Sequence, residues 1–202
     1  LSPSSAASDV YKRQGPIGAL LRPLGTLSFD EAYDLFAEEV RAGVDAGVDL
    51  FIIETMTDLA EIKAAVLACR ENSDLPVFAT MTFEEDGRTF LGTSPEVAAI
   101  TLDAIGADVL GINCSQGPAE LRELAARMLT VTDKPVMVQA NAGLPHVDDD
   151  GNTVFDIQAP EYAKAVDGMI EDGVSVVGGC CGTTPAHMAA LRTLIDLSLI
   201  HI

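Results

Sequence analysis

The stretch Gly106-Ala107-Asp108-Val109-Leu110-Gly111-Ile112-Asn113-Cys114-Ser115 decides the fold of this chain, because it joins the end of a helix to a strand. Gly106 suits a helix C-terminal cap, and the aliphatic run that follows predicts a strand buried on both faces. Polar residues and a cysteine come directly after this strand. In α/β folds, functional sites are built at that end of the strands.

The same junction recurs at residues 47–53 and 173–177, where a glycine precedes an aliphatic run. At two further junctions Pro76 and Pro135 occupy the first strand position, which proline tolerates. These patterns predict five strands alternating with helices. We expect strands near 50–54, 76–82, 108–113, 135–140 and 174–179, and helices near 29–46, 58–72, 95–105, 118–131, 159–172 and 185–197.

Strict alternation of strand and helix implies a parallel α/β sheet, either open and doubly wound or closed into a (β/α)8 barrel. Functional-looking residues follow all five strands and favour the barrel, where every strand end faces one mouth. They are Glu54, Thr80 to Thr82, Asn113 to Ser115, Asn141, Cys180 and Cys181. Five strands cannot close such a barrel, and residues 15–18 read as a loop after an absent strand. We therefore expect the C-terminal five strands and helices of a TIM barrel, with the N-terminal strands missing.

The two ends of the chain do not follow this pattern. Residues 1–14 are rich in Ser and Ala and lack an apolar period, and residues 198–202 do not continue the last helix. We expect both to be a non-native prefix and a non-native tail, and residues 15–197 to form one partial domain.

Composition excludes several classes of function. The net charge of −19, with 12 Lys plus Arg, would repel a phosphate backbone, so we expect no nucleic-acid partner. The sequence has no apolar run of about 20 residues and no secretory signal, so we expect no membrane partner. Four cysteines, two of them adjacent, fit reduced thiols and a cytoplasmic protein.

Three of the cysteines follow strand ends: Cys114, and the adjacent pair Cys180 and Cys181 within the run GGCCGTTP at 178–185. Three thiolates can hold one zinc ion and leave its fourth position open, as in catalytic sites. Core packing or a vicinal disulfide remain the alternatives. Glycines at 178, 179 and 182 would let both adjacent sulfurs turn inward, and a helix beginning at Pro185 would favour their thiolate form.

Other conspicuous residues have simpler interpretations. Cys69 lies among helical alanines and is expected to be a small buried hydrophobe. His146, His187 and His201 are expected to face solvent. We expect small turns rather than calcium loops at residues 148–152 and 84–87.

Five motifs together resemble the homocysteine S-methyltransferase family. They are IETMTDLAEIKAA at 53–65, MTFEEDGRTFLGT at 81–93, GINCS at 111–115, NAGLP at 141–145 and GGCCGTTP at 178–185. The likeness is greatest to the homocysteine-binding domain of cobalamin-dependent methionine synthase, and it covers residues 15–197. It implies a (β/α)8 barrel that binds zinc and homocysteine.

The resemblance also implies roles for individual residues. The zinc ligands would be Cys114, Cys180 and Cys181. Glu54 matches the acid that holds the amino group of the substrate. Asn141 matches a mouth residue that is a candidate for the fourth zinc position when substrate is absent. Ser115 and the strand end Thr80 to Thr82 are weaker matches to the substrate site.

The implied activity is transfer of a methyl group to the thiol of homocysteine, giving methionine, with no catalytic side chain beyond the metal site. The expected donor is methylcobalamin on another domain or protein, and cobalamin- and folate-binding domains of the same parent are the expected partners. Betaine or S-methylmethionine is the alternative donor. A non-catalytic zinc-thiolate module is the alternative of another class.

The chain also departs from the family pattern. The Asp-Gly-rich loop after the family's first strand, and the Thr-Asn segment that ends its second strand, do not occur here. Part of the substrate site would then be missing, so we expect this polypeptide alone to be poorly stable and inactive.

Overall fold

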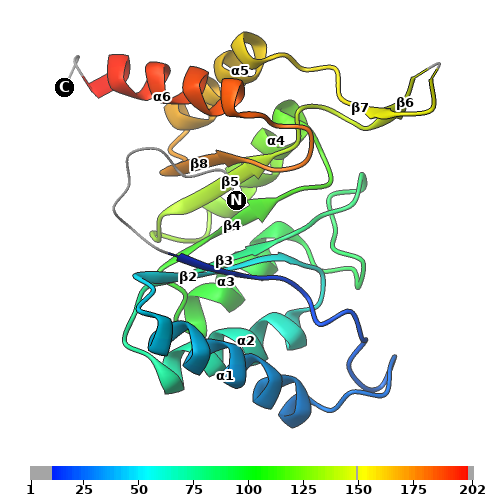
Figure 1. The fold of residues 1–202 in the computed structure, drawn as a ribbon, viewed down its shortest axis with the longest axis vertical. Helices are drawn as coiled ribbons and strands as arrows, with labels where there is room; N and C mark the ends of the chain where they lie inside the picture. The colour runs from blue at the N-terminus through cyan, green and yellow to red at the C-terminus, as the bar shows by residue number, and fades with distance from the viewer. Residues whose placement is uncertain (1–10, 149, 200–202) are drawn as a thin grey trace.

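The structure is a computed structural model that describes residues 11–148 and 150–199. Its centre is a parallel sheet of six strands in the order β1-β2-β3-β4-β5-β8 (Figure 1). The strands are β1 Tyr11–Gln14, β2 Leu50–Met56, β3 Val77–Met81, β4 Val109–Asn113, β5 Val136–Ala140 and β8 Val176–Gly179. All five strands that the sequence predicts are present.

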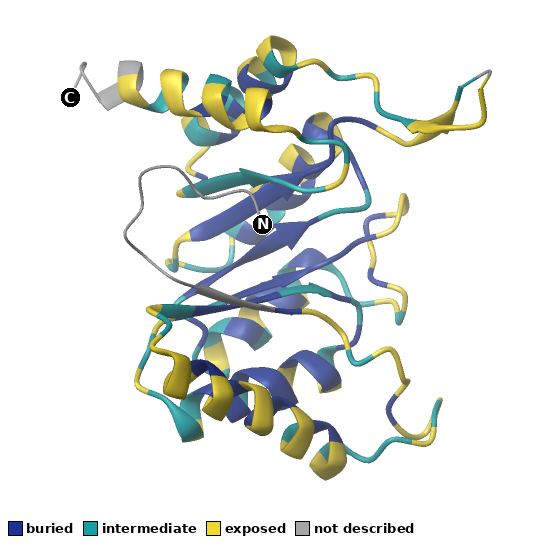
Figure 2. Ribbon diagram, viewed as in Figure 1, coloured by how far each residue is buried: buried dark blue, intermediate teal, exposed yellow. Residues whose placement is uncertain are grey.

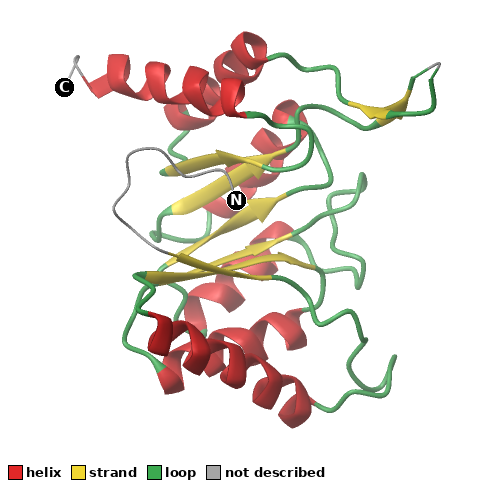
Figure 3. Ribbon diagram, viewed as in Figure 1, coloured by secondary structure: helices red, strands yellow, loops and turns green. Residues whose placement is uncertain are grey.

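Helices connect these strands, as the alternating pattern predicts (Figure 3). They are α1 Phe29–Ala46, α2 Leu59–Asn72, α3 Pro95–Ala104, α4 Pro118–Leu129, α5 Ala159–Glu171 and α6 Pro185–Leu199. Local signals explain the ends of α1: Ser28 and Glu31 form a capping box, and Gly47 closes the helix with φ 76°. The predicted α/β architecture is therefore confirmed.

The helices pack against one face of the sheet. A single core cluster joins buried residues of all six helices to alternate strand residues such as Ile53, Leu110 and Val138. The intervening residues Ile52, Val109 and Met137 form a separate small cluster on the other face, with strand residues alone. The central strands β3, β4 and β5 are almost entirely buried (Figure 2). Since strand order follows chain order without reversal, the sheet is singly wound.

The strand β1 was not predicted. Residues 11–14 were assigned to the prefix, yet they pair in parallel with β2, from Tyr11 opposite Leu50 to Gln14 opposite Ile53. The Gln14 side chain is buried. The expectation of a five-stranded sheet was wrong by one edge strand, because an edge strand joins a sheet through its backbone and its polar sequence carries no apolar signal.

A β-bulge interrupts β2 just before the edge where the site lies. Ile53 pairs with Ala79 and Met56 with Met81, so two residues of β2 oppose the single residue Thr80. Ile53 and Met56 both face the helices. The extra residue therefore moves Glu54 and Thr55 out of the regular alternation, as bulges near functional sites commonly do.

Several smaller features of the structure bear on the sequence predictions. Cys69 is fully buried, as predicted, and burial raises the pKa of its thiol to about 12. Residues 84–88 form a tight turn, and β6 His146–Val147 pairs antiparallel with β7 Thr153–Val154 in the predicted hairpin. His201 lies outside the described residues. Within the described ranges, no helix is both long enough and apolar enough to cross a membrane.

Candidate metal centre

Three cysteine sulfurs meet at the carboxyl edge of the sheet. The Sγ atoms of Cys114, Cys180 and Cys181 all lie within 4.8 Å of one another. The distance from Cys114 Sγ to Cys181 Sγ is 3.6 Å. None of the three forms a disulfide. The structure thus brings together the three thiols that the sequence singled out.

Cys114 reaches the cluster because the chain leaves β4 in an unusual conformation. Both Cys114 and Ser115 have φ 64°, in the left-handed region that side-chain-bearing residues rarely adopt. The Cys114 N–H donates to the Gln139 carbonyl at 2.9 Å, and the Gln116 N–H donates to the Cys114 carbonyl at 2.8 Å. These bonds hold the strained turn and point the sulfur across the edge of the sheet toward β8.

Cys180 and Cys181 lie in a turn and not in the strand. Since β8 ends at Gly179, the alternation of side chains across a strand does not apply to the pair. The Thr183 N–H donates to the Cys180 carbonyl at 3.2 Å, and Gly182 has φ 77°. Any Cβ at 182 would also collide with the ring of Phe155. Of the glycines expected to supply unusual backbone angles, Gly182 does so.

The cluster has the dimensions of a zinc site. Four sulfur ligands about 2.3 Å from a tetrahedral zinc stand about 3.8 Å apart. The Cys114 and Cys181 sulfurs are 3.6 Å apart, and all three sulfurs lie within 4.8 Å of one another. Cys181 is exposed, whereas Cys114 and Cys180 are half-buried. An ion bound by the three sulfurs would therefore have its fourth position on the solvent side.

The three sulfurs influence one another's ionisation. A hydrogen bond from the Cys180 thiol, opposed by burial, lowers the pKa of Cys114 to about 5. The Cys114 thiolate in turn raises the pKa of Cys180. The pKa of Cys181 is raised, first by burial and then by Cys114. In the metal-free protein, the Cys114 anion and burial thus favour the protonated form of both adjacent thiols.

Asn141 is buried against the cluster. Its Oδ1 accepts the Cys181 N–H at 3.0 Å, and its own N–H donates to the Gln116 carbonyl at 3.0 Å. A hydrogen bond from its side chain also contributes to the lowered pKa of Cys114. The residue therefore contacts both segments that carry the sulfurs.

The other sequence candidates lie at the same edge. Glu54 is partly exposed within the bulge of β2. The Ser115 N–H stabilises the Cys114 thiolate. Thr80 and Thr82 are buried, and the Thr82 hydroxyl donates to the Asn113 carbonyl at 2.9 Å.

Asn113 was expected at the end of its strand, but no role was predicted for its side chain. Its side chain is fully buried and forms hydrogen bonds to both β2 and β3. It also approaches the sulfur of Cys180 at 3.9 Å. The available signal was its position, directly before Cys114 at a strand end.

Tyr162, on α5, was also missed. Its hydroxyl lies 2.9 Å from the Ala140 carbonyl and 2.8 Å from the Gly178 carbonyl, and thereby links the ends of β5 and β8. Burial raises its pKa, so the group stays a neutral donor.

His187 was expected to face solvent, and this was wrong. Its side chain is buried in the first turn of α6, with its ring edge-on to that of Tyr162. Its Nδ1 accepts the Thr184 N–H at 3.2 Å, and its Nε2 lies 2.9 Å from the Ile157 carbonyl. The histidine therefore anchors the segment that follows the cysteine pair. A single helical residue with polar neighbours gave no sign of this burial.

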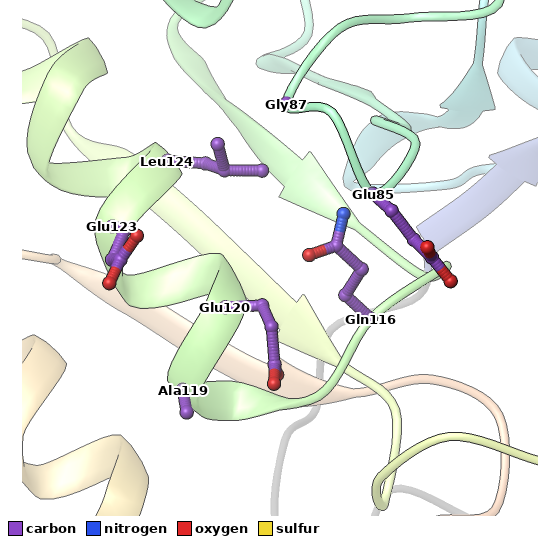
Figure 4. A pocket seen from close by; sticks show the side chains of 7 residues that line it. All are labelled: Glu85, Gly87, Gln116, Ala119, Glu120, Glu123 and Leu124. Atoms are coloured by element: carbon purple, nitrogen blue, oxygen red, sulfur yellow. The ribbon is translucent and has the colours of Figure 1, made fainter.

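A hollow of about 210 Å³ lies between the loop after β3 and the start of α4 (Figure 4). Glu85, Glu120 and Glu123 line it, together with Gln116. The Gln116 side chain donates to the Phe83 carbonyl at 3.2 Å and to the Glu84 carbonyl at 2.6 Å. Through these two hydrogen bonds, Gln116 links the loop after β3 to the turn that carries Cys114.

Comparison with known proteins gives one family. The model of the homocysteine S-methyltransferase family matches residues 4–195. The chain is 38% identical over 192 residues to the methionine synthase of Mycobacterium tuberculosis, which covers 92% of this chain. It spans 16% of the length of that relative and also 16% of the methionine synthase of Mycobacterium leprae, to which it is likewise 38% identical.

Solved structures agree on the fold. The apo form of the homocysteine methyltransferase MmuM from Escherichia coli superposes with a TM-score of 0.74 at 23% identity, covering 96% of this chain and 65% of that one. Its metallated form gives a TM-score of 0.68 at 24% identity, covering 83% of this chain and 52% of that one. With the family model matching nearly the whole chain, the protein belongs to the homocysteine S-methyltransferase family.

Proposed function

We propose that this chain binds one zinc ion through Cys114, Cys180 and Cys181 and prepares the thiol of homocysteine for methylation. The observation that carries the proposal is the convergence of three free sulfurs within 4.8 Å, one of them exposed. A zinc ion held there would supply Lewis acidity that keeps a coordinated substrate thiol deprotonated at neutral pH.

The residues around the cluster would bind and orient the amino acid. Glu54, at the same edge of the sheet, would hold the ammonium group of homocysteine. Asn141 would help to define the position that the substrate sulfur takes, and Ser115 would line the site. No side chain beyond the metal site is needed as an acid or base, because the substrate thiol loses its proton to solvent on binding.

The reaction itself is a simple displacement. The homocysteine sulfur forms a bond to the methyl carbon, while the bond between that carbon and the donor breaks and its electron pair stays with the donor. Methionine and the demethylated donor are the products. The sulfur must be electron-rich for this attack, and the donor must carry an activated methyl group.

We infer that the donor is methylcobalamin carried by another domain or protein. The support is the likeness to methionine synthases in which this segment makes up 16% of the length. Cobalamin- and folate-binding domains would then belong to the same parent. Betaine or S-methylmethionine remains the alternative donor.

We also infer that the sheet is the C-terminal part of a (β/α)8 barrel. Its unreversed strand order and its helices on one face are the features of such a barrel. The free thiols of the site support a location in the reducing cytoplasm.

The proposal is tested by metal content and zinc X-ray absorption. We expect one zinc per chain with three sulfur ligands, and a fourth sulfur when homocysteine is added. A first shell that already has four protein ligands and does not change with homocysteine would instead identify a non-catalytic zinc-thiolate module. Methionine formation is assayed in parallel with each of the three donors.

Matched cysteine variants identify the metal site. Cys114→Ser should lower zinc affinity by at least about 100-fold and abolish the homocysteine-dependent change, because it removes one of three ligands. Cys69→Ser makes the same replacement at a buried thiol away from the cluster and should keep a full equivalent of zinc. Full zinc binding by the Cys114 variant would refute the assignment.

A further inference from the structure

We propose that Asn113 is a positioning residue that couples the bulge of β2, which carries Glu54, to the metal-binding sulfur of Cys180. The inference rests on the proposed function and adds to it a physical link between the amino-acid subsite and the metal subsite. Nothing in the sequence motifs assigns this role to the side chain of Asn113.

The hydrogen-bonding capacity of Asn113 is fully used. Its Oδ1 accepts the Thr55 N–H and the Thr80 hydroxyl, each at 2.7 Å. Its Nδ2 donates to the Thr55 hydroxyl oxygen at 2.8 Å and lies 3.9 Å from Cys180 Sγ. A carboxamide offers two acceptor sites and two donors, so all four are directed at named partners. Because the side chain is fully buried, solvent does not compete for them.

The two bonds to Thr55 hold the bulge in place. Thr55 has φ 65°, which is strained for a β-branched residue and costs on the order of 1–3 kcal/mol. A bulge also leaves a backbone N–H without a partner in the strand ladder. Asn113 supplies that partner and a second bond to the hydroxyl. It therefore fixes the backbone one residue after Glu54.

The remaining donor of Asn113 points to the metal subsite. An N–H directed at a ligand sulfur stabilises its thiolate form and restricts its orientation, and such outer contacts tune metal sites. One rigid amide thus touches β2, β3 and the turn after β8. Asn113 would thereby set the spacing between Glu54 and the Cys180 sulfur. We expect this spacing to match the distance between the ammonium group and the thiol of bound homocysteine.

The variant Asn113→Asp tests the N–H donors of the Asn113 side chain. It keeps an acceptor for the Thr55 N–H and the Thr80 hydroxyl, but it loses both N–H donors and places a carboxylate near the thiolates. We expect zinc affinity, measured by competition with a chromophoric chelator, to fall by about 10- to 100-fold. We also expect homocysteine affinity of the zinc-loaded protein to fall, and the charge-transfer bands of the cobalt-substituted protein to shift.

The matched control is Asn152→Asp, the same change at an exposed hairpin residue. It should leave both affinities within about twofold of the parent, as expected for an exposed site. A folded Asn113→Asp protein with both affinities also within about twofold would overturn the proposal.

A second variant covers the case in which Asn113→Asp does not fold. Thr55→Val removes only the hydroxyl that accepts from Asn113, and Thr55→Ser restores it. We expect Thr55→Val to weaken homocysteine binding with zinc content unchanged, and Thr55→Ser to bind as the parent does. Equal binding by all three proteins would overturn the coupling.

Failure of the proposed function gives a different pattern. If the parent chain binds zinc but not homocysteine, the proposed function is wrong. The loss of zinc affinity in Asn113→Asp then still decides whether Asn113 positions Cys180.

Discussion

Three non-glycine residues have positive φ within the described ranges, and all three lie beside the sulfur cluster or its link to β2. They are Thr55, Cys114 and Ser115. Each such conformation costs on the order of 1–3 kcal/mol, which surrounding hydrogen bonds must offset. The bonds from Asn113 to Thr55 and from Cys114 to Gln139 do so. Within the described residues, backbone strain is therefore concentrated around the sulfur cluster and the bulge of β2.

Glu61 is a residue whose ionisation should limit stability. It is buried in the first turn of α2, and its Oε1 accepts the Ile17 N–H at 2.7 Å. Burial raises the pKa of this carboxyl above its ordinary value. Its stabilising contribution is full below the unfolded-state pKa and is lost as the pH rises through the folded pKa. Glu61→Gln keeps an acceptor and cannot ionise, so we expect its stability relative to the parent to rise as the pH increases from about 4 through the raised pKa of Glu61.

Urea unfolding of both proteins at a series of pH values measures this difference. Glu38→Gln removes a carboxyl from an exposed position on α1 and serves as the control. The prediction is contradicted if the free energy of unfolding of Glu61→Gln, relative to the parent, stays constant or falls as the pH rises.

At the residue scale the sequence predicted the clustered thiols better than the residues that support them. Cys114, Cys180 and Cys181 were identified because thiols at strand ends are rare and chemically specific. The supporting contacts of Asn113 and the burial of His187 were not predicted, since asparagine and histidine are common in turns and helices and only tertiary contacts distinguish them. The burial of His187 depends on Tyr162 and Ile157, which are distant in the sequence.

At the scale of elements, hydrophobic periodicity predicted the helices and the central strands to within a few residues. Those elements bury an apolar face or an apolar run, and burial leaves a pattern in the sequence. The strand β1 and the bulge of β2 left no such pattern. The bulge arises from the pairing of Ile53 and Met56 with β3, which is a property of two strands together.

Helix α6 depends on His187 for its attachment at the start. His187→Ala would leave the Thr184 N–H and the Ile157 carbonyl without their partner. We expect His187→Ala to lower the free energy of unfolding by about 1–3 kcal/mol. Chemical denaturation of the metal-free parent and variant measures this difference in free energy.

His146→Ala provides the comparison for α6. His146 is exposed, and its ion pair with Asp156 at 3.4 Å is of the surface type. Its removal should change stability by less than about 0.5 kcal/mol. If the two histidine replacements changed the free energy of unfolding equally, the buried contacts of His187 would not be needed for stability.

At the scale of the whole molecule, the sulfur ligands connect strands that are not neighbours. Cys114 follows β4, the cysteine pair follows β8, and β5 lies between them. A metal that binds only the folded chain stabilises it by about 2.7 kcal/mol at a hundred times its Kd. We expect zinc to raise the thermal unfolding temperature and a chelator to reverse the rise.

The same titration on Cys114→Ser separates site binding from general effects of the cation. With a net charge of −19, the protein could gain stability from any divalent ion through screening. Magnesium at the same concentration controls for this. A rise of equal size in Cys114→Ser, or with magnesium, would contradict stabilisation through the sulfur cluster.

The order in which the ligands occur along the chain has a consequence for biosynthesis. Cys114 and Cys181 are 67 positions apart, and two helices and the four strands β5 to β8 are formed between them. On a ribosome, Cys114 emerges well before the adjacent pair, so a nascent chain would hold it as a lone thiol. A zinc ion held by all three sulfurs, as proposed, would therefore bind only after β8 has joined the sheet. Its delivery would be a late event in maturation, unlike in small zinc domains where the ion drives folding itself.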